Sequence, residues 1–501
     1  MVIPGYIIEL LQKLDKKGFE AYIVGGCVRD FLLGREPQDW DLTTNALPEE
    51  ILAIFPNAKY ENNFGTVLLP LRKETNSEGK GELMDVIEIT TYRSEQGYSD
   101  RRHPDEVLFE KEIDKDLERR DFTINALALR LAKEKEELKA HRELITIDNQ
   151  IYELVDLFRG RRDLKDKIIR AVGEPSERFK EDALRMIRAI RFSSQLGFAI
   201  EEKTQRAIVK LAGAIKFVSK ERIRDELVKI IKSDRPAQGV NLLHETKLLQ
   251  YIIPELEDGV AMEQNHHHIY KVYEHNLNTL KFCPSSDWRV RLAALFHDIG
   301  KPKTRKFIDG AATFYNHEYA GAKQVERIMK RLKFSTDDYL KVTNLVRNHM
   351  FYYNVGEVTA ASVRRLIVKV GKENLQDLID LRVGDRLGSG TPKAMPYKLR
   401  HLQYMLEKVQ NDPVSVKMLA VNGNDLMTEL GLEPGPKIGA ILDVLLAEVI
   451  EDPALNTKEY LLKKSQALQN FNLEELREQA KEKIEERREE DDNNLKKSFQ
   501  V

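Results

Sequence analysis

The stretch from Ala21 to Asn45, AYIVGGCVRDFLLGREPQDWDLTTN, is the part of the sequence around which the rest is organised. An apolar run typical of a β-strand stops at the pair Gly25-Gly26, and apolar residues then recur at helical spacing until Gly34. Glycines allow backbone N–H groups to approach an anion at a helix start, and Arg29 adds a positive charge beside them. We therefore expect a phosphate-binding turn here.

A second feature of the same stretch is the sequence Asp39-Trp40-Asp41-Leu42, followed by two threonines. The pattern reads as a strand, on which Asp39 and Asp41 project from one face and Trp40 from the other. Two adjacent carboxylates repel one another unless a cation lies between them, and hard oxygen ligands suit Mg²⁺. Phosphates and magnesium therefore fit one small site.

The glycine pair, the helix and the two aspartates follow one another within residues 25–41. In this order they resemble the signature of the nucleotidyltransferases related to DNA polymerase β, in particular the class II tRNA nucleotidyltransferases and bacterial poly(A) polymerases. The resemblance implies an α+β protein, with a mixed-sheet head followed by an all-helical neck and body, an HD domain and a helical tail. It also implies template-independent addition of nucleotides to RNA.

The third catalytic carboxylate is expected on the strand 84–90. Alternation along a strand places Val86 and Glu88 on one face and Asp85 on the other. The resembling family carries an acidic residue at the matching place in EITTYR, which makes Glu88 the expected partner of the two aspartates. Asp85 is the rival candidate.

The segment LERRDFTINA, residues 117–126, is similar to a second block of the same family. The pattern predicts a helix on which Asp121 and Asn125 lie one turn apart, so that both can address the ribose hydroxyls. Arg119 or Arg120 is expected near the triphosphate. The alternative is an ordinary helix start with a salt bridge.

Residues 94–110 lack periodicity and contain many turn formers, so they are predicted to form a loop. In the resembling family this loop permits the switch from adding C to adding A. Enzymes restricted to C tend to lack its basic element, whereas Asp100-Arg101-Arg102 is present here.

A third block, residues 178–191, reads RFKEDALRMIRAIR. On a helix Asp182 and Arg185 share a face. The carboxylate accepts a hydrogen bond from the exocyclic amine of C or A, and the guanidinium donates to the neighbouring ring acceptor, which disfavours G and U. The resemblance implies this role, and places Arg188 among the nucleotide-binding residues. The alternative is a plain intrahelical ion pair.

Six residues downstream follow the order of the HD-domain metal-dependent phosphohydrolases, to which the segment LFHDIGK is similar. Imidazoles combined with carboxylates are ligands for a transition metal, here Mn, Ni, Co or Fe. By analogy the substrates are 2′,3′-cyclic phosphates at RNA ends or phosphate monoesters of nucleotides. The six residues are His275, His297, Asp298, His317, His349 and Asp385.

Composition sets outer limits on the function. The 501 residues carry a net charge of −2, which argues against a uniformly basic nucleic-acid coat. Residues 159–191 nevertheless hold 11 Lys and Arg against 6 Asp and Glu, a local excess of five positive charges suited either to an RNA backbone or to a solvated helix face. No apolar run approaches a membrane span, and the N-terminus reads as an amphipathic helix rather than a signal peptide, so a cytoplasmic location is expected.

The sequence therefore predicts an enzyme that adds CCA to tRNA 3′ ends from CTP and ATP with Mg²⁺. The alternatives are an A-adding enzyme or poly(A) polymerase, and a nucleotide phosphohydrolase whose head only binds RNA. The oligomeric state stays open. The expected domains are a head at 1–150, a neck and body at 151–264, an HD domain at 265–400 and a tail at 401–501.

Overall fold

The computed structural model describes most of the chain, and the protein folds into two compact units. The first unit comprises residues 1–347 and 388–390, and the second comprises 348–387 and 391–501, so the division falls inside the range expected for the HD domain. The described residues are 2–61, 65–72, 83–97, 105–132, 140–147, 149–264, 269–309, 311–351, 353–391, 393–410 and 416–500. The predicted loop element Asp100-Arg101-Arg102 lies outside them.

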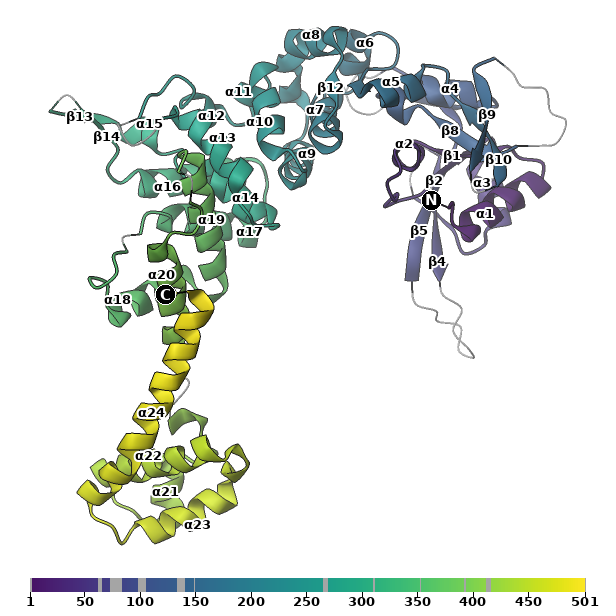
Figure 1. The fold of residues 1–501 in the computed structure, drawn as a ribbon. Helices are drawn as coiled ribbons and strands as arrows, with labels where there is room; N and C mark the ends of the chain where they lie inside the picture. The colour runs from purple at the N-terminus through teal and green to yellow at the C-terminus, as the bar shows by residue number, and fades with distance from the viewer. Residues whose placement is uncertain are drawn as a thin grey trace. The chain divides into compact units, whose positions relative to one another are not determined.

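The first unit begins with a mixed sheet of eight strands in the order β3-β4-β5-β2-β1-β8-β10-β9 (Figure 1). Among the described strands of this sheet, β2 and β5 are the parallel neighbours and the other neighbouring pairs are antiparallel. The predicted mixed-sheet α+β head is confirmed. The strands are β1 (Ala21–Val24), β2 (Asp41–Thr44), β3 (Lys59–Tyr60), β4 (Thr66–Arg72), β5 (Leu83–Thr91), β8 (Ala128–Leu131), β9 (Arg142–Ile147) and β10 (Gln150–Val155).

Strand β1 lies within the sheet because its residues are apolar without alternation. All four of its side chains are buried, with Tyr22 and Ile23 fully inaccessible, as expected for a strand covered on both faces. The amphipathic N-terminal segment forms α1 (Gly5–Lys16), as predicted, and buries Ile7 and Leu14. The other head elements are α2 (Gly26–Leu32), α3 (Pro48–Ile54), α4 (Ile113–Glu118), the 3₁₀ turn η1 (Thr123–Asn125), and the antiparallel pair β6 (Arg93–Gln96) and β7 (Glu106–Phe109).

The chain then becomes helical, as the sequence predicts. Two short strands, β11 (Ile168–Ile169) and β12 (Ala199–Ile200), pair in parallel, and β13 (Lys306–Ile308) with β14 (Ala311–Thr313) forms a hairpin. The helices are α5 (Gly160–Asp166), α6 (Pro175–Glu181), α7 (Leu184–Leu196), α8 (Glu202–Leu211), α9 (Lys220–Lys232), α10 (Pro236–Glu245), α11 (Leu249–Ile252), α12 (Pro254–Glu257), α13 (Val272–Phe282), α14 (Trp288–Phe296), α15 (Lys301–Thr304), α16 (His317–Arg331) and α17 (Thr336–Asn348).

The second unit is helical in its described residues. Its core gathers around α22 (Pro436–Glu451), where Ile441 and Leu445 are inaccessible to solvent and share a cluster with Leu461 and Leu476. A fully buried Leu or Ile contributes roughly 1.5–3 kcal/mol, so this cluster accounts for much of the stability of the unit. The helices are α18 (Ala360–Val370), α19 (Leu375–Gly388), α20 (Tyr397–Gln410), α21 (Gly423–Leu430), α22 (Pro436–Glu451), α23 (Lys458–Leu468) and the long α24 (Leu473–Phe499), drawn in yellow in Figure 1.

No helix in the described ranges combines the length and the apolar character that crossing a membrane requires.

Candidate active site

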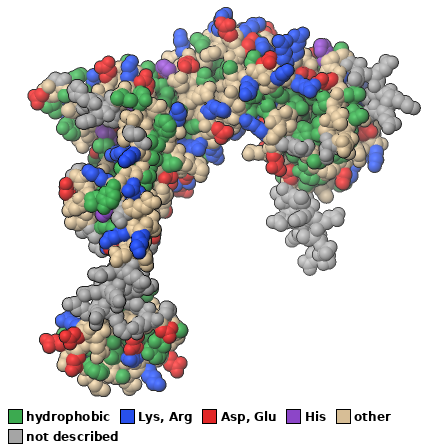
Figure 2. Space-filling view, in the orientation of Figure 1, with side chains coloured by type: hydrophobic (Ala, Val, Ile, Leu, Met, Phe, Trp, Pro, Cys, Tyr) green, Lys and Arg blue, Asp and Glu red, His purple; other side chains and the backbone are tan. Residues whose placement is uncertain are grey.

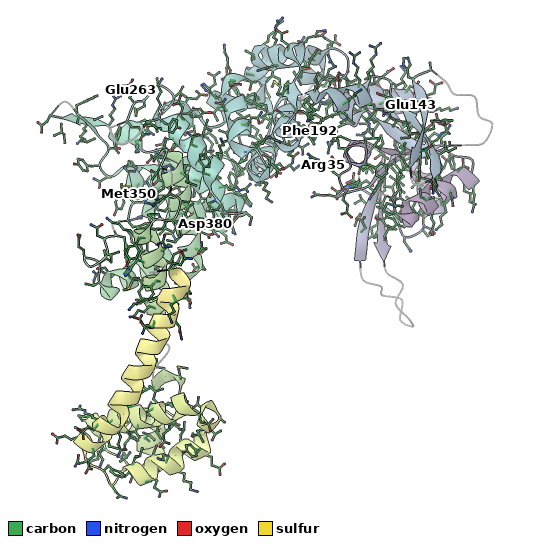
Figure 3. All side chains as sticks on the ribbon, viewed as in Figure 1. Arg35, Glu143, Phe192, Glu263, Met350 and Asp380 are labelled. Carbon is green, nitrogen blue, oxygen red and sulfur yellow. The ribbon has the colours of Figure 1, made fainter. Side chains whose placement is uncertain are left out.

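A cavity of about 670 Å³ opens in the first unit where α2, the segment leading into β2, η1 and α7 come together. Figure 3 labels one residue from each of two of these elements, Arg35 after α2 and Phe192 on α7. Most of the residues predicted for the catalytic and nucleotide-binding site line this cavity. They are Gly25, Gly26, Arg29, Asp39, Asp41, Arg120, Asp121, Asn125 and Arg188.

The two aspartates both line this cavity, but the backbone that positions them differs from the single strand that the sequence predicts. Strand β2 begins only at Asp41, and Asp39 lies in an exposed bend before it, so the expectation of one strand carrying both carboxylates was wrong. Trp40 between them is 6% exposed and its ring lies 6.5 Å from that of Phe31 on α2. We infer that burying this indole anchors the segment while both carboxylates stay at the cavity.

The electrostatics of Asp41 are those of a crowded cation site. Burial raises the pKa of Asp41, Arg120 lowers it and Asp39 raises it again. On the parallel neighbour β5, Glu88 stands directly opposite Asp41 in the strand register. Its pKa is raised by burial and by the nearby charges of Asp41, Glu61 and Asp39. Asp39 thus disfavours the charge of Asp41, and both disfavour that of Glu88, as expected where carboxylate oxygens are gathered to hold a cation such as Mg²⁺.

Asp85, the rival for the third carboxylate, points elsewhere. Along β5 the residues Val86 and Glu88 are exposed whereas Ile87 and Ile89 are buried, which confirms the predicted alternation. Asp85 belongs to the other face, where it accepts a hydrogen bond of 3.4 Å from the Tyr6 hydroxyl of α1. The strand geometry therefore groups Glu88, and not Asp85, with Asp41.

The turn between β1 and α2 has the backbone conformation that its glycines predict. Gly25 has a φ of +84°, and a Cβ built on it would lie 3.0 Å from a guanidinium nitrogen of Arg120 and 3.9 Å from a carboxylate oxygen of Asp41. The missing side chain thus leaves the space between a cation and an anion of the site open. Arg29, one turn into α2, is held by Asp30 and donates a 2.8 Å hydrogen bond to Asn125.

Arg119 and Arg120 are adjacent in sequence but do different things. Both bind the fully buried carboxylate of Asp116, at 2.6 Å and 3.0 Å respectively. Arg119 turns away to Glu95, at 3.2 Å, whereas Arg120 lines the cavity and keeps a buried Nε without a hydrogen-bond partner among the described residues. Of the two predicted triphosphate ligands, Arg120 is the one with a guanidinium available to an anion.

Residues 121–125 do not form the predicted α-helix. Helix α4 ends at Glu118, and only the short turn η1 follows. The two predicted ribose ligands still meet, because the side chain of Asn125 donates a 3.1 Å hydrogen bond to Asp121. Arg188 of α7 binds the same carboxylate at 2.6 Å. Burial alone would raise the pKa of Asp121, but Arg188 and Asn125 lower it to about 2, so this carboxylate is a fixed charge in the wall.

Asp182 and Arg185 do not share a helix face, contrary to the prediction. Helix α6 ends at Glu181 and α7 begins at Leu184, with Asp182 in extended backbone between them. Arg222 of α9 binds the Asp182 carboxylate at 2.6 Å. Arg185 instead pairs with Glu181 and donates to the backbone carbonyl of Arg119 at 3.1 Å.

The two residues nevertheless stay close to the cavity wall. Asp182 raises the pKa of Arg188, and Arg185 lowers that of Asp121, although burial is the leading influence on both groups. Each is therefore within electrostatic reach of the Asp121–Arg188 ion pair that lines the cavity.

The sequence analysis missed an aromatic residue at the centre of this wall. The ring of Phe192 has the guanidinium carbons of Arg191, Arg29 and Arg188 at 4.2, 5.1 and 5.4 Å from its centroid. The spacing of residues along α7 could have predicted this wall, because positions three and four apart share one helix face. Positions 188, 191, 192 and 195 follow this spacing, and all four line the cavity. Figure 2 shows further Lys and Arg side chains over α6, within the predicted basic segment.

Four of the six predicted HD ligands form a buried cluster in the first unit. The Nε2 atoms of His275 and His297 are 3.0 Å apart, and the Asp298 carboxylate lies 3.4, 3.3 and 3.2 Å from the Nε2 atoms of His275, His297 and His317. Lys301 binds the same carboxylate at 2.6 Å. The other two predicted ligands, His349 and Asp385, belong to the second unit.

The tautomers of His297 and His317 indicate that the space between their rings and Asp298 is occupied by a positive charge. The Nδ1 atoms of His297 and His317 lie 2.9 and 2.8 Å from the carbonyl oxygens of Ala294 and Phe314, and can only donate to them. In a neutral ring the Nε2 atom then carries a lone pair and no proton, and here that lone pair faces the carboxylate oxygens of Asp298. That arrangement is repulsive unless a proton or a metal ion occupies the space. The donor set therefore fits a transition metal.

Comparisons with known proteins agree with this geometry. The chain matches the family described as poly A polymerase head domain over residues 21–170, the probable RNA and SrmB-binding site of polymerase A over 197–259, and tRNA nucleotidyltransferase domain 2 over 311–464. The CCA-adding enzyme of Ligilactobacillus salivarius (strain UCC118) is 32% identical over 462 residues, which cover 92% of this chain and 96% of the relative. That of Enterococcus faecalis (strain ATCC 700802 / V583) is 32% identical over 454 residues, 90% and 93% of the two chains.

Solved structures of CCA-adding enzymes also match this chain. The Bacillus stearothermophilus CCA-adding enzyme in complex with CTP matches with a TM-score of 0.56 at 27% identity, over 93% of this chain and 99% of that one. The Thermotoga maritima CCA-adding enzyme complexed with tRNA, at 21% identity and a TM-score of 0.50 over 93% and 96% of the two chains, shares the fold. The fold and the comparisons thus define a tRNA nucleotidyltransferase. Within that class, the chain belongs to the family of the CCA-adding enzymes.

Proposed function

We propose that this protein adds C, C and A to the 3′ ends of tRNA, taking CTP and ATP as substrates. The observation that supports it best is the convergence of Asp39, Asp41, the Gly25 turn and Arg120 on one cavity, in a chain that is 32% identical to CCA-adding enzymes over most of its length. The named complex of a relative with CTP supports the choice of substrate. tRNA processing agrees with the cytoplasmic location that the sequence predicts.

The reaction transfers a nucleotide from a triphosphate to RNA. The 3′ hydroxyl of the RNA attacks the α-phosphorus, and pyrophosphate leaves with the electron pair of the broken P–O bond. Asp39, Asp41 and Glu88 would hold Mg²⁺, which when bound lowers the pKa of the attacking hydroxyl and neutralises the triphosphate. Arg120 offers the leaving phosphates a charge-assisted donor at the Gly25 turn.

The remaining residues position the nucleotide. Asp121 and Asn125 are proposed to receive the ribose hydroxyls, since their side chains already form one hydrogen-bonded pair at the cavity. Asp182 and Arg185 are proposed to choose the base. Arg222 binds the Asp182 carboxylate, so base recognition requires that carboxylate to exchange an arginine for the amine of C or A.

An incorporation assay separates this function from its rivals. The protein is incubated with CTP, ATP and one of three substrates: a tRNA lacking CCA, a tRNA ending in CC, or an oligo(A) primer. Addition to the tRNA that ends after three nucleotides supports the proposal. Long A tails on the oligo(A) primer would instead identify a poly(A) polymerase, and addition of A alone to a CC-ended tRNA would identify an A-adding enzyme.

A second function is favoured by the buried histidine cluster of the first unit. We propose that His275, His297, Asp298 and His317 bind a transition metal of the kind Mn, Ni, Co or Fe, and that this metal supports hydrolysis of 2′,3′-cyclic phosphates or phosphate monoesters. Such an ion, when bound, supplies a nucleophilic hydroxide at neutral pH. Among the protein groups, Lys301 supplies a positive charge to the Asp298 carboxylate. The part of His349 and Asp385 as ligands stays a prediction.

Removal of one imidazole tests this metal site. His297→Ala is expected to lower the affinity for Ni²⁺ or Mn²⁺ at least ~10-fold, because changes around metal ligands typically cost that much. Metal content is measured by mass spectrometry after loading and gel filtration. The matched control is His244→Ala, which removes a histidine of the same unit that binds Glu257 at 2.8 Å instead. Equal metal content in the wild type and both variants would contradict the assignment.

A further inference from the structure

The second unit contains a basic, aromatic pocket that neither proposed activity uses. Its volume is about 270 Å³, close to the lower end of the ~300–1,000 Å³ typical of small-molecule sites, so it has room for one nucleotide rather than a helical stem. Its lining residues all belong to the second unit. They are Phe351, Tyr353, Arg382, Arg386, Pro396, Lys398, Leu399 and Leu402.

The cations of this pocket are gathered where they repel one another. Arg382 and Arg386 stand one turn apart on the same face of α19, and Lys398 comes from α20. No carboxylate belongs to the described lining, although Arg382 binds Asp385 beside it at 2.7 Å. Like charges at this spacing cost stability unless an anion joins them, and three cations around one cavity suit a phosphate group.

Two of these cations keep donors for a ligand. The Nε of Arg386 is buried and has no hydrogen-bond partner among the described residues, which costs free energy as long as it stays unpaired. Lys398, an exposed residue, bonds only to the neutral amide oxygen of Asn354 among the described residues. An oxyanion in the pocket would satisfy the first donor and neutralise the second.

The other wall is aromatic and held in place. The ring of Phe351 lies 5.8 Å from the guanidinium carbon of Arg382, and the segment around it includes Met350, labelled in Figure 3. The Tyr353 hydroxyl makes a 2.6 Å hydrogen bond with Nδ1 of His401 on α20. Rings fixed beside guanidinium groups form the platform on which proteins stack nucleic-acid bases.

From this arrangement we propose that the pocket binds a single phosphorylated nucleotide, with the phosphate on Arg382, Arg386 and Lys398 and the base against Phe351 and Tyr353. A free mononucleotide and the 3′-phosphorylated end of an RNA share this chemistry. The site belongs to the second unit and is separate from the head cavity, which lies in the first. As a binding site it does not depend on either proposed activity.

Calorimetric titration of the full-length protein with adenosine 3′-monophosphate tests the proposal, and variants of the pocket that leave the head cavity intact separate binding at the pocket from binding at the head. Arg386→Gln and the exposed Lys398→Gln are expected to weaken binding at least ~10-fold, as loss of a charge-assisted donor does. Phe351→Leu is expected to weaken binding of the nucleotide but not of inorganic phosphate. The matched control Arg365→Gln, an exposed arginine of α18 in the same unit, should bind as the wild type does.

Each outcome of these titrations either supports or overturns the proposed nucleotide site. Weakening by Lys398→Gln supports the site even if Arg386→Gln fails to fold. A second arm compares the binding of short RNAs that end in a 3′-phosphate or a 3′-hydroxyl. If the wild type prefers the 3′-phosphate and the pocket variants lose this preference, the RNA end is a ligand of the pocket. Equal affinity in all variants, or no binding of the mononucleotide, would overturn the proposal. Because hydrolysis is not measured, these outcomes do not depend on the activity proposed for the histidine cluster.

Discussion

Asp41→Ala is expected to reduce the rate of nucleotide addition at least ~10³-fold, a loss of about 4 kcal/mol of transition-state stabilisation. Burial and the charge of Asp39 raise the pKa of Asp41 and Arg120 lowers it, while Asp41 in turn raises the pKa of Glu88. Removing Asp41 leaves two carboxylates to hold the cations that the triphosphate requires. Single-turnover addition of C to a tRNA lacking CCA measures the effect, and tRNA affinity should change little.

The matched control for this variant lies on the same sheet. Asp85→Ala removes a carboxylate of β5 that points to the opposite face, toward Tyr6, and should leave the rate within about twofold of wild type. Glu88→Ala removes the residue directly opposite Asp41 and should approach the effect of Asp41→Ala. A large loss in Asp85→Ala with normal activity in Glu88→Ala would reverse the assignment of the third carboxylate.

The double variant Asp182→Ala, Arg185→Ala is expected to lose discrimination against UTP and GTP by ~10–100-fold. A base-edge pair of this kind contributes ~1–3 kcal/mol of selectivity. The free energy of unfolding should fall by less than the free energy of base selectivity. The reason is that Asp182 forms a partly exposed ion pair with Arg222, whose side chain is about a quarter exposed. The measurement is the ratio of kcat/KM values for CTP and UTP on the same tRNA.

Two variants sharpen this test. Glu177→Ala removes an exposed carboxylate of α6, the helix that ends just before Asp182, and should not alter selectivity. Arg222→Ala frees Asp182 from its present partner, so it should preserve discrimination while changing KM for CTP. Selectivity that survives the double variant would place base choice on other residues of the cavity.

Much of the head follows from local sequence rules. The Gly25-Gly26 pair predicts the strand-to-helix turn because Gly25 occupies a positive φ that other residues rarely adopt. Alternation along β5 separates Glu88 from Asp85 correctly, since the side-chain period of a strand is two. Both rules depend on neighbours in sequence.

The errors arise where distant contacts decide the backbone. Residues 121–125 have a helical pattern, yet the Thr123 N–H donates to the carbonyl of Arg170 and its hydroxyl to Asp163, so the segment forms the short turn η1 and not an α-helix. Asp182 interrupts the predicted helix because its side chain accepts the N–H of Leu184, a capping role that Asp commonly takes. That signal was present in the sequence, whereas the partner Arg222, 40 residues away, was not foreseeable from spacing.

The most direct test of the proposed function is stepwise incorporation on three tRNAs that end before CCA, after the first C and after CC. Each is incubated with CTP alone, ATP alone and both, and the products are resolved at single-nucleotide length. The account predicts that CTP alone extends the first tRNA by two residues, that ATP alone extends only the CC-ended tRNA by one, and that both together complete CCA and stop. Growth beyond CCA, or no addition by a protein that binds CTP, would contradict it.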